Sequence, residues 1–516
     1  MKTKLFLSVI IITLILLACN CRTITLPYLK STATSSPAQL PANTNVGTPT
    51  PPPLISTSAA PFNISWDDRS LFQHGLTASY QGVLNHLAGA SVYHLAFSLS
   101  NPPTSIDGIE EVRYTNQESV ALSEVDFAIF SEILGGGIKI NDIRLDGLPV
   151  TPIFSTGLIR VPLSTSLQPG QSIIFHIEFS IIVPTLGGDA YYGIFGYNEG
   201  ILSLAHAYPT ILVYNEQGWN SQIPDLIGDP LFSDAGFYLV SIDAPADLIL
   251  VASGIEVSRQ ESSGRQQVVY ADGPARDFYL AAGKDFIKQN EKVGETTFNS
   301  YAPASLARFS RSALKTAEAA IDDFGQRYAP YPYSEFDIFP IVTTAGGVEF
   351  PGMTAVSETL FSQDSYLESV VTHEVGHQWF YNLVGNETQQ QPWLDESLAQ
   401  FVTWQYFLDR YGTQAAQSFS SAIQGRWDTL DSQKIPIGEP VSAYTGDSYS
   451  AIIYGRGFFF FLALRQQIGQ TNFDSLMHDY ASTFAWDIAT TESFKLLAEQ
   501  HCNCDLTPLF QDWVYP

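Results

Sequence analysis

The sequence is poor in cysteine, in basic side chains and in long apolar runs. Its four cysteines lie in two close pairs, Cys19 with Cys21 and Cys502 with Cys504. A disulfide that closes over one intervening residue is strained, and two sulfurs alone do not make a zinc site. The sequence therefore indicates no disulfide framework, and the fold must rest on its apolar cores.

Basic residues are scarce, with 25 Lys and Arg against 52 Asp and Glu, which gives a formal net charge of -27. Such a surface repels phosphate, so nucleic acid is not an expected partner. The charge favours cationic or amine-bearing ligands, although an acidic composition is also typical of proteins that are merely soluble. At 516 residues and 45% hydrophobic composition, the chain can form folded domains, about two to four of them.

The one long apolar run is at the N-terminus. Lys2 and Lys4 precede a mainly apolar segment over residues 5–18, which has the length of a signal peptide and is short for a membrane span. It ends in Leu-Leu-Ala before Cys19, which resembles a bacterial lipobox, a motif whose cysteine becomes acylated. We expect a lipoprotein signal peptide at 1–18, a lipid on Cys19 and an exported, membrane-anchored protein. The alternative is ordinary secretion with Cys19 unmodified.

The remaining chain divides by texture into three parts. Residues 19–61 are rich in Ser, Thr and Pro, which is typical of an extended tether. Residues 62–290 contain short β-rich runs between turn residues, which predicts a β-rich sandwich or saddle-like domain. Residues 291–516 turn mainly helical, which gives an α+β multidomain chain. The clearest helical patterns cover 305–328, 366–383, 395–411 and 454–468, and an extended segment covers 336–342.

A metal-binding pattern lies in the third part. His373 and His377 are four residues apart, with Glu374 directly after the first. Two side chains at this spacing leave the same face of a helix, so both rings can reach one zinc ion. Glu374 is then placed to act as a general base on a water molecule at the metal. The alternative is a helix with two ordinary histidines.

A third ligand is expected at Glu396, 19 residues after His377. A catalytic zinc needs three protein ligands and an open position. The residues between form a loop, so Glu396 begins a second helix that can pack antiparallel to the first. Taken alone, this glutamate could equally be a solvated carboxylate favoured by the helix dipole.

Four segments in order resemble the gluzincin aminopeptidase family, that of membrane alanyl aminopeptidase and leukotriene-A hydrolase. They cover residues 331–457: Tyr-Pro-Tyr at 331–333, Gly-Val-Glu-Phe at 347–350, the zinc motif from His373 to Glu396, and Tyr-Gly-Arg-Gly at 454–457. A weaker resemblance covers Ala-His-Ala-Tyr-Pro at 205–209 in the β-rich part. The resemblance implies a thermolysin-like catalytic domain at 291–516 with one zinc ion per chain.

The resemblance also implies roles for residues outside the metal set. Tyr454 would donate a hydrogen bond to the developing oxyanion. Glu349, in the segment that begins at Gly347, would bind the free α-amino group of a peptide. The alternatives are an ordinary tyrosine at a helix start and a carboxylate in a surface turn.

The sequence departs from the family pattern in two places. Val and Phe replace Met and Asn in the Gly-x-Met-Glu-Asn motif, and a second amine-binding group is not evident. The family's position for that group falls at Gly200, with Glu199 only adjacent. The chain also ends at Pro516 without the large helical domain of long members, which favours a more open cleft. It therefore resembles a short bacterial lipoprotein member of the family.

We interpret the chain as a zinc metallopeptidase that acts on peptides with a free N-terminus, with Glu374 as general base. Two alternatives stay open. One is an endopeptidase with an open cleft, which follows if the amine-binding groups are incomplete. The other is a zinc-bearing scaffold or peptide-binding lipoprotein with little turnover, against which Glu374 and Tyr454 argue, since mere binding requires neither.

Overall fold

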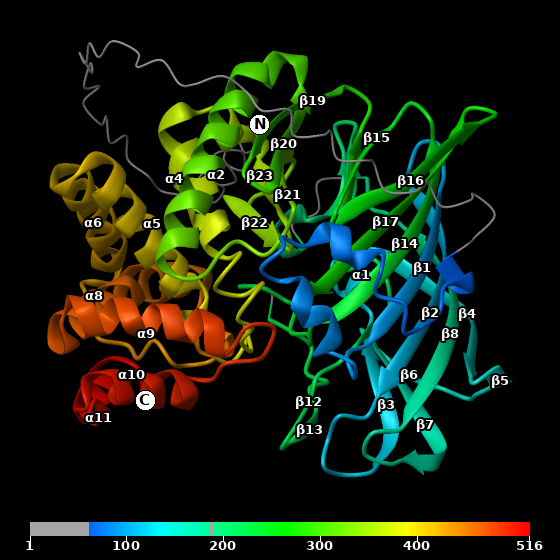
Figure 1. Ribbon diagram of the computed structural model, residues 1–516, viewed down its shortest axis with the longest axis horizontal. Helices are drawn as coiled ribbons and strands as arrows, with labels where there is room; N and C mark the ends of the chain where they lie inside the picture. Colours follow the sequence, from blue (N-terminus) through cyan, green and yellow to red (C-terminus); the bar gives the residue numbers. More distant parts are fainter. Residues whose placement is uncertain (1–60, 186–189, 226) are drawn as a thin grey trace, which may run out of the picture.

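The computed structural model describes residues 61–185, 190–225 and 227–516. The β-rich half and the helical half lie side by side (Figure 1). Two apolar cores hold them, one between the N-terminal sheets and one that runs through the helices. The signal peptide, Cys19 and nearly all of the tether lie outside the described residues. None of the described helices has the length and apolarity that crossing a bilayer requires.

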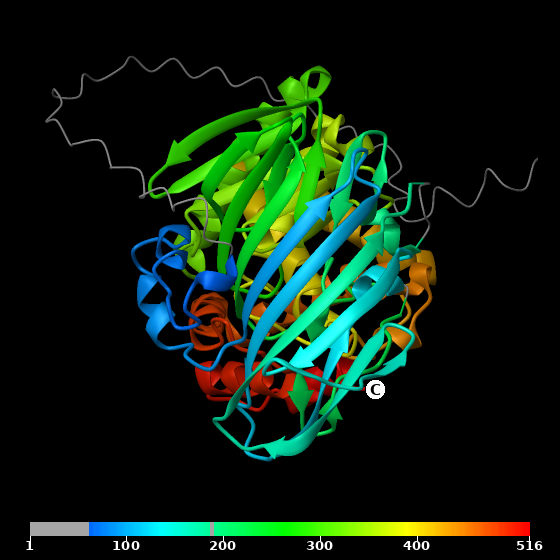
Figure 2. The same ribbon diagram turned by 90° about the vertical axis from the view of Figure 1, so that its right-hand side faces the viewer.

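The β-rich half is built on an eight-stranded sheet in the order β16-β17-β14-β1-β2-β8-β4-β5, which faces the viewer in Figure 2. Two four-stranded sheets, β15-β18-β10-β9 and β11-β3-β7-β6, accompany it. The elements are β1 (Val92–Leu99), β2 (Ser105–Thr115), β3 (Leu122–Ala128), α1 (Phe130–Ile133), β4 (Gly137–Leu145), β5 (Leu148–Pro149), β6 (Ile153–Ser155), β7 (Leu158–Leu167), β8 (Ser172–Ile182), β9 (Phe195–Asn198), β10 (Ile201–Leu204), β11 (Thr210–Ile211), β12 (Tyr214–Asn215), β13 (Gly218–Trp219), β14 (Gly236–Pro245), β15 (Ile249–Ala252), β16 (Ile255–Ser262), β17 (Arg265–Ala275) and β18 (Leu280–Gly283).

The helical half combines a five-stranded sheet, in the order β19-β20-β21-β23-β22, with a set of helices. The strands are β19 (Phe286–Val293), β20 (Thr296–Pro303), β21 (Glu335–Ile341), β22 (Gly347–Phe350) and β23 (Met353–Ser357). The helices are α2 (Ala307–Arg327), α3 (Glu358–Phe361), α4 (Asp364–Gly376), α5 (Glu396–Tyr411), α6 (Thr413–Trp427), α7 (Gly446–Tyr449), the π-helix η9 (Ser450–Arg456), α8 (Gly457–Ile468), α9 (Gln470–Thr483), α10 (Thr491–Cys502) and α11 (Thr507–Trp513). The expected boundary at residue 290 falls inside β19.

The expected α+β organisation is confirmed, and the sequence patterns explain it. In β8, Phe175, Ile177 and Phe179 alternate with more exposed residues and enter the N-terminal core, as the two-residue period of a strand requires. In α2, Leu314 and Ile321 lie on the buried face at helical spacing. Local periodicity therefore sets both kinds of element.

One helix is shorter than the sequence predicts. The pattern over 366–383 indicates a single helix, but α4 ends at Gly376 and His377 is its C-cap residue. Tertiary contacts cause the difference. Gly376 packs against α5, where an added Cβ would lie 2.8 Å from a Val402 methyl group. Beyond the helix, Tyr381 adopts a φ of 134°. Because His377 keeps helical angles (φ -66°, ψ -13°), its spacing from His373 is preserved.

A buried arginine joins the two halves. Arg276, just after β17, donates hydrogen bonds to the carbonyls of Tyr381 (2.9 Å) and Asp487 (2.7 Å) in the helical half. It also donates to Ser233 O at 3.0 Å, within its own half. A Cβ on Gly385 would lie 2.3 Å from the guanidinium carbon, so the loop fits closely around this cation. The loop that follows α4 is thus fixed from the β-rich half.

The C-terminal cysteines differ from the expectation. Cys502 and Cys504 form a disulfide, with Asn503 between them in the left-handed conformation. That conformation turns the chain back on itself and brings the two Cα atoms to 5.1 Å. The bond closes over one residue and links no distant parts of the fold.

Candidate metal centre

Three side chains converge where α4 meets the start of α5. His373 lies in the last turn of α4, His377 caps that helix, and Glu396 is the first residue of α5. The His373 Nε2 and His377 Nε2 atoms are 3.2 Å apart, and Glu396 Oε2 lies 3.1 Å from the first and 3.4 Å from the second. The structure thus brings together all three side chains that the sequence predicts as ligands.

This donor set fits a zinc ion. Ligands ~2.0–2.1 Å from a tetrahedral ion lie about 3.3–3.4 Å from one another, close to the three separations here. The Nδ1 atom of His377 faces Phe380 O at 3.1 Å. That contact favours a proton on Nδ1 and leaves the Nε2 lone pair for a metal. Two imidazoles and one carboxylate, with room for a fourth ligand, are the donors of catalytic zinc sites.

Glu374 is a residue of α4, and its side chain faces the edge strand β22. Its carboxylate, together with Glu349 and His377, forms a second group of donor atoms within 4.8 Å of one another. It rests directly on Gly347, where an added Cβ would lie 2.5 Å from Glu374 Oε1. Burial raises the pKa of Glu374 to about 8, and a bound cation would lower this pKa by Coulomb attraction. Gly347 therefore provides the space in which the predicted base sits.

Tyr454 reaches the same centre from the π-helix η9. Its hydroxyl donates a hydrogen bond to Glu396 Oε1, the oxygen that does not face the histidines. Burial, followed by the Glu396 charge, raises the pKa of Tyr454 well above its usual range, so the group stays a donor. Tyr454 lies inside the π-helix η9 and not at the start of a regular helix. Such wide turns are frequent at functional sites.

Glu349 is buried and not in an exposed turn. It lies on β22, is 7% exposed, and its Oε1 atom has no hydrogen-bond partner. The same atom is 3.7 Å from His377 Nδ1. Its neighbour is the carboxyl group of Asp229, which comes from the β-rich half. Burial and the Asp229 charge raise the pKa of Glu349, and burial with the Glu396 charge raises that of Asp229 to about 6.

The site holds more acidic groups than its basic groups can balance. Asp395 adds a fifth carboxyl to those of Asp229, Glu349, Glu374 and Glu396, and all of these but the partly exposed Asp229 are buried. Among the residues that the structure describes, these five carboxyl groups form ion pairs with His373 and His377, and none pairs with a lysine or arginine. Clustered buried carboxylates are costly without compensating cations. The site is therefore suited to cationic ligands.

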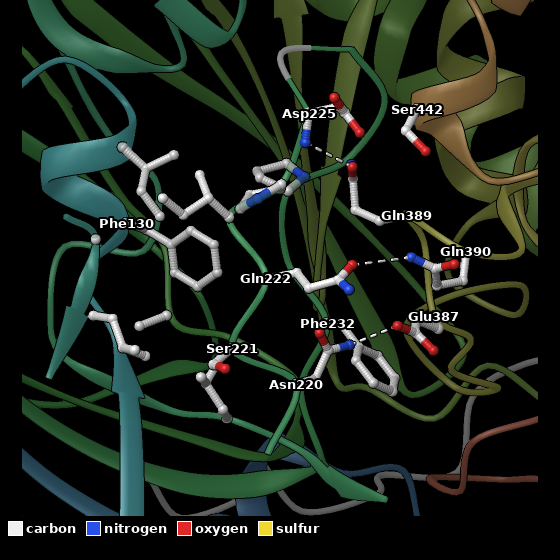
Figure 3. A pocket seen from close by; sticks show the side chains of 18 residues that line it. Phe130, Asn220, Ser221, Gln222, Asp225, Phe232, Glu387, Gln389, Gln390 and Ser442 are labelled. Carbon is white, nitrogen blue, oxygen red and sulfur yellow. Dashed lines mark hydrogen bonds between the residues drawn. The ribbon is translucent and has the colours of Figure 1, made fainter. Parts of the chain in front are cut away.

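The loop that carries Asp229 is held by hydrogen bonds from the helical half. Thr388 Oγ1 and Gln389 Nε2 donate to Asp229 O at 3.0 and 2.7 Å. Gln389 Oε1 accepts from Asp225 N at 2.8 Å, and Asn220 Nδ2 donates to Glu387 Oε1 at 2.6 Å (Figure 3). These contacts border a small cavity between α1 and the loop at 387–390. They hold the backbone at Asp229 against the loop at 387–390.

Sequence reasoning missed Asp229. The family position for a second amine-binding group falls on Gly200 and Glu199, and both occupy the tight turn between β9 and β10, with positive φ angles. Asp229 lies between a glycine and a proline, an ordinary turn sequence that gives no sign of a binding role. Its place beside Glu349 depends on contacts between residues far apart in the chain.

Comparison with known proteins supports the resemblance. Residues 312–513 match the Peptidase family M1 domain. The chain is 28% identical over 279 residues to leucine aminopeptidase 2 of Yarrowia lipolytica and 26% identical over 274 residues to leukotriene A-4 hydrolase of Xenopus laevis. These alignments cover 49% and 50% of this chain but only 41% and 44% of those relatives, so the chain spans less than half of their length.

Solved structures extend the likeness to most of the fold. An M1 zinc metallopeptidase from Deinococcus radiodurans superposes with a TM-score of 0.62 at 17% identity, over 82% of this chain and 93% of that one. A variant of that enzyme, bound to a Tyr-Ser-Ala substrate, gives a TM-score of 0.62 at 18% identity, over the same shares of the two chains. The resemblance to the gluzincin aminopeptidase family, and the two-part fold that it implies, are confirmed.

Proposed function

We propose that this chain, which carries a Peptidase family M1 domain, is a zinc-dependent aminopeptidase. The observation that carries the proposal is the pair of neighbouring carboxyl groups, the buried Glu349 and the partly exposed Asp229, beside the set formed by His373, His377 and Glu396. One group of donors suits a divalent metal ion. The other suits the ammonium group of a peptide N-terminus, which is cationic below a pKa of ~7.7–8.0.

Each side chain then has a distinct part in hydrolysis. His373, His377 and Glu396 would hold the zinc ion, which when bound polarises the scissile carbonyl and makes water a nucleophile near neutral pH. Glu374 accepts the proton of the attacking water and passes it to the leaving amine. Tyr454 donates a hydrogen bond to the oxygen that gains negative charge.

The amine-binding pair would fix the position of the cut. A carboxylate pair that binds the α-ammonium group places the first peptide bond over the metal, so one residue is released at a time. Asp229 also supplies the second acidic group that is not evident from the sequence. The pair is held in place, since Glu349 lies in a strand and the main-chain carbonyl of Asp229 accepts hydrogen bonds from Thr388 and Gln389.

This proposal predicts a preference for free N-termini. Wild type should cleave free-amine peptides with a higher kcat/KM than N-acetylated ones, and Glu349→Gln or Asp229→Asn should remove most of that preference. A charge-assisted hydrogen bond contributes about 1.5–3 kcal/mol, equivalent to roughly ten- to a hundredfold in kcat/KM. Paired assays of one peptide in both forms measure the effect.

Glu291→Gln is the matched control. It removes an exposed carboxylate on β19 that accepts a hydrogen bond from Lys315, away from the amine-binding pair and from the loops that hold it, and should leave the preference unchanged. Equal cleavage of free and acetylated peptides by wild type would favour the open-cleft endopeptidase. Zinc binding without turnover of either would favour the binding lipoprotein.

The location of the protein is a separate part of the proposal. The lipobox-like sequence before Cys19 supports export and anchoring to the cell membrane by an N-terminal lipid. Cys19→Ser should release the protein into the aqueous phase of a detergent partition, whereas Cys21→Ser should leave it with the detergent. A wild-type protein with an unmodified N-terminus in the aqueous phase would contradict the lipid anchor.

A further inference from the structure

Two consecutive residues at the start of α5 hold the π-helix that carries Tyr454. Glu396 accepts the hydrogen bond of the Tyr454 hydroxyl. The next residue, Ser397, donates through Oγ to the carbonyl of Ile453 at 2.6 Å, and both residues are fully buried. Ile453 directly precedes Tyr454. The backbone and the side chain of one short segment are thus held by adjacent residues of another helix.

The packing around Ser397 is unusually close. An added Cβ on Gly457 would lie 2.0 Å from Ser397 Oγ and 2.7 Å from its Cβ, so only glycine leaves room for the serine. Gly455, which directly follows Tyr454, makes a less close approach, since an added Cβ there would lie 3.2 Å from the backbone nitrogen of Trp427. The two glycines let the wide turn lie directly against α5 and α6.

A π-helix departs from the usual helical hydrogen-bond pattern, and its buried carbonyls need partners for that reason. Ser397 supplies one partner at the residue next to Tyr454. Without the hydroxyl, Ile453 O would lose a buried hydrogen bond, and the turn could shift toward a regular helix. Such a shift would move the Tyr454 hydroxyl away from Glu396.

We propose that Ser397 is a positioning residue that holds the Tyr454 hydroxyl at the metal centre through the Ile453 carbonyl. The proposal rests on the proposed function only for the kinetic effect. The structural effect, a looser segment at 450–457, does not depend on any activity.

A double-mutant cycle tests it. Ser397→Ala should lower kcat about tenfold, with KM changed less than about twofold and zinc content unchanged. In a Tyr454→Phe background the same substitution should cost less than about twofold, because the hydroxyl that it positions is already gone. Hydrogen exchange followed by mass spectrometry should show faster exchange over residues 450–457 in Ser397→Ala.

Thr403→Val is the matched control. Thr403 is a buried α5 residue whose hydroxyl donates to Ala399 O at 2.7 Å within the same helix, so its loss should leave exchange at 450–457 unchanged. Equal losses of kcat in both backgrounds, reduced zinc in Ser397→Ala, or unchanged exchange would each overturn the proposal. If Ser397→Ala does not fold, Ser397→Gly also removes the hydroxyl without adding volume and serves the same cycle. A wild type that binds zinc without cleaving peptides refutes the proposed function, while the exchange measurement still decides the role of Ser397.

Discussion

The Glu374→Gln variant should keep its fold and its zinc ion but lose about 10²- to 10⁴-fold in kcat, the usual contribution of a general base. Glutamine has nearly the same volume and remains on top of Gly347, so the packing is preserved. It cannot accept a proton, however, and its side chain is not one of the three ligands. The measurement is kcat with one free-amine peptide, beside the zinc content of the same sample.

Glu368→Gln serves as a control on the same helix. Its carboxylate accepts hydrogen bonds from Tyr406 and Tyr411, away from the ligands, and the substitution should leave kcat within about threefold. Near wild-type turnover by Glu374→Gln would show that another group takes the proton. Loss of zinc together with loss of activity would show that Glu374 is needed for metal binding. The result would then contradict its assignment as the general base.

Removal of a ligand should have a different and broader effect. His377→Ala should abolish zinc binding, reduce hydrolysis to background and lower the melting temperature. At a free zinc concentration a thousand times Kd, bound metal contributes about 4 kcal/mol. That corresponds to a shift of roughly 10 °C for a domain of this size. His373→Ala and Glu396→Ala should behave alike, because each leaves only two ligands. Elemental analysis and calorimetry measure the two effects.

A second group of possible metal ligands, which contains one histidine, provides the control. His176 lies on the outer face of the large sheet, with Asp142 and Glu178 close enough to share an ion. Its contacts to Glu111 and Glu178, at 3.3 and 3.4 Å, can equally be ion pairs of a protonated ring. His176→Ala should leave zinc content and activity unchanged. If His176→Ala removes the zinc and His377→Ala does not, the metal site has been misassigned.

Sequence patterns predicted those features of the centre that depend on local spacing. His373 and His377 share one helical turn, and Glu396 begins the next helix, so their convergence follows from residues within one helix pair. The position of Asp229 could not be predicted, because it depends on packing between the two halves. The π-helix around Tyr454 was missed for a similar reason. It lies against other helices, where Ser397 donates to the Ile453 carbonyl and Gly455 and Gly457 make close contacts.

The end of α4 illustrates the same limit on a smaller scale. The sequence pattern continues to residue 383, yet the helix stops at Gly376. The loop that follows is hydrogen-bonded at Tyr381 to Arg276 of the β-rich half. Helical propensity describes a segment in isolation, and tertiary contacts override it where they are strong. The metal geometry survives, since His377 keeps helical backbone angles at the helix end.

The Arg276 contacts bear on how the protein can be divided. Residues 312–513 match the family model, yet the loop behind His377 is fixed by a guanidinium that comes from position 276. A fragment cut at the limits of sequence similarity would expose the carbonyls that Arg276 now satisfies, and it would lack Asp229 as well. We therefore expect the smallest fragment that folds on its own to be larger than the segment that matches the family model. For the same reason, we expect chimaeras that combine one half of this chain with the other half of a relative to be less stable than either parent protein.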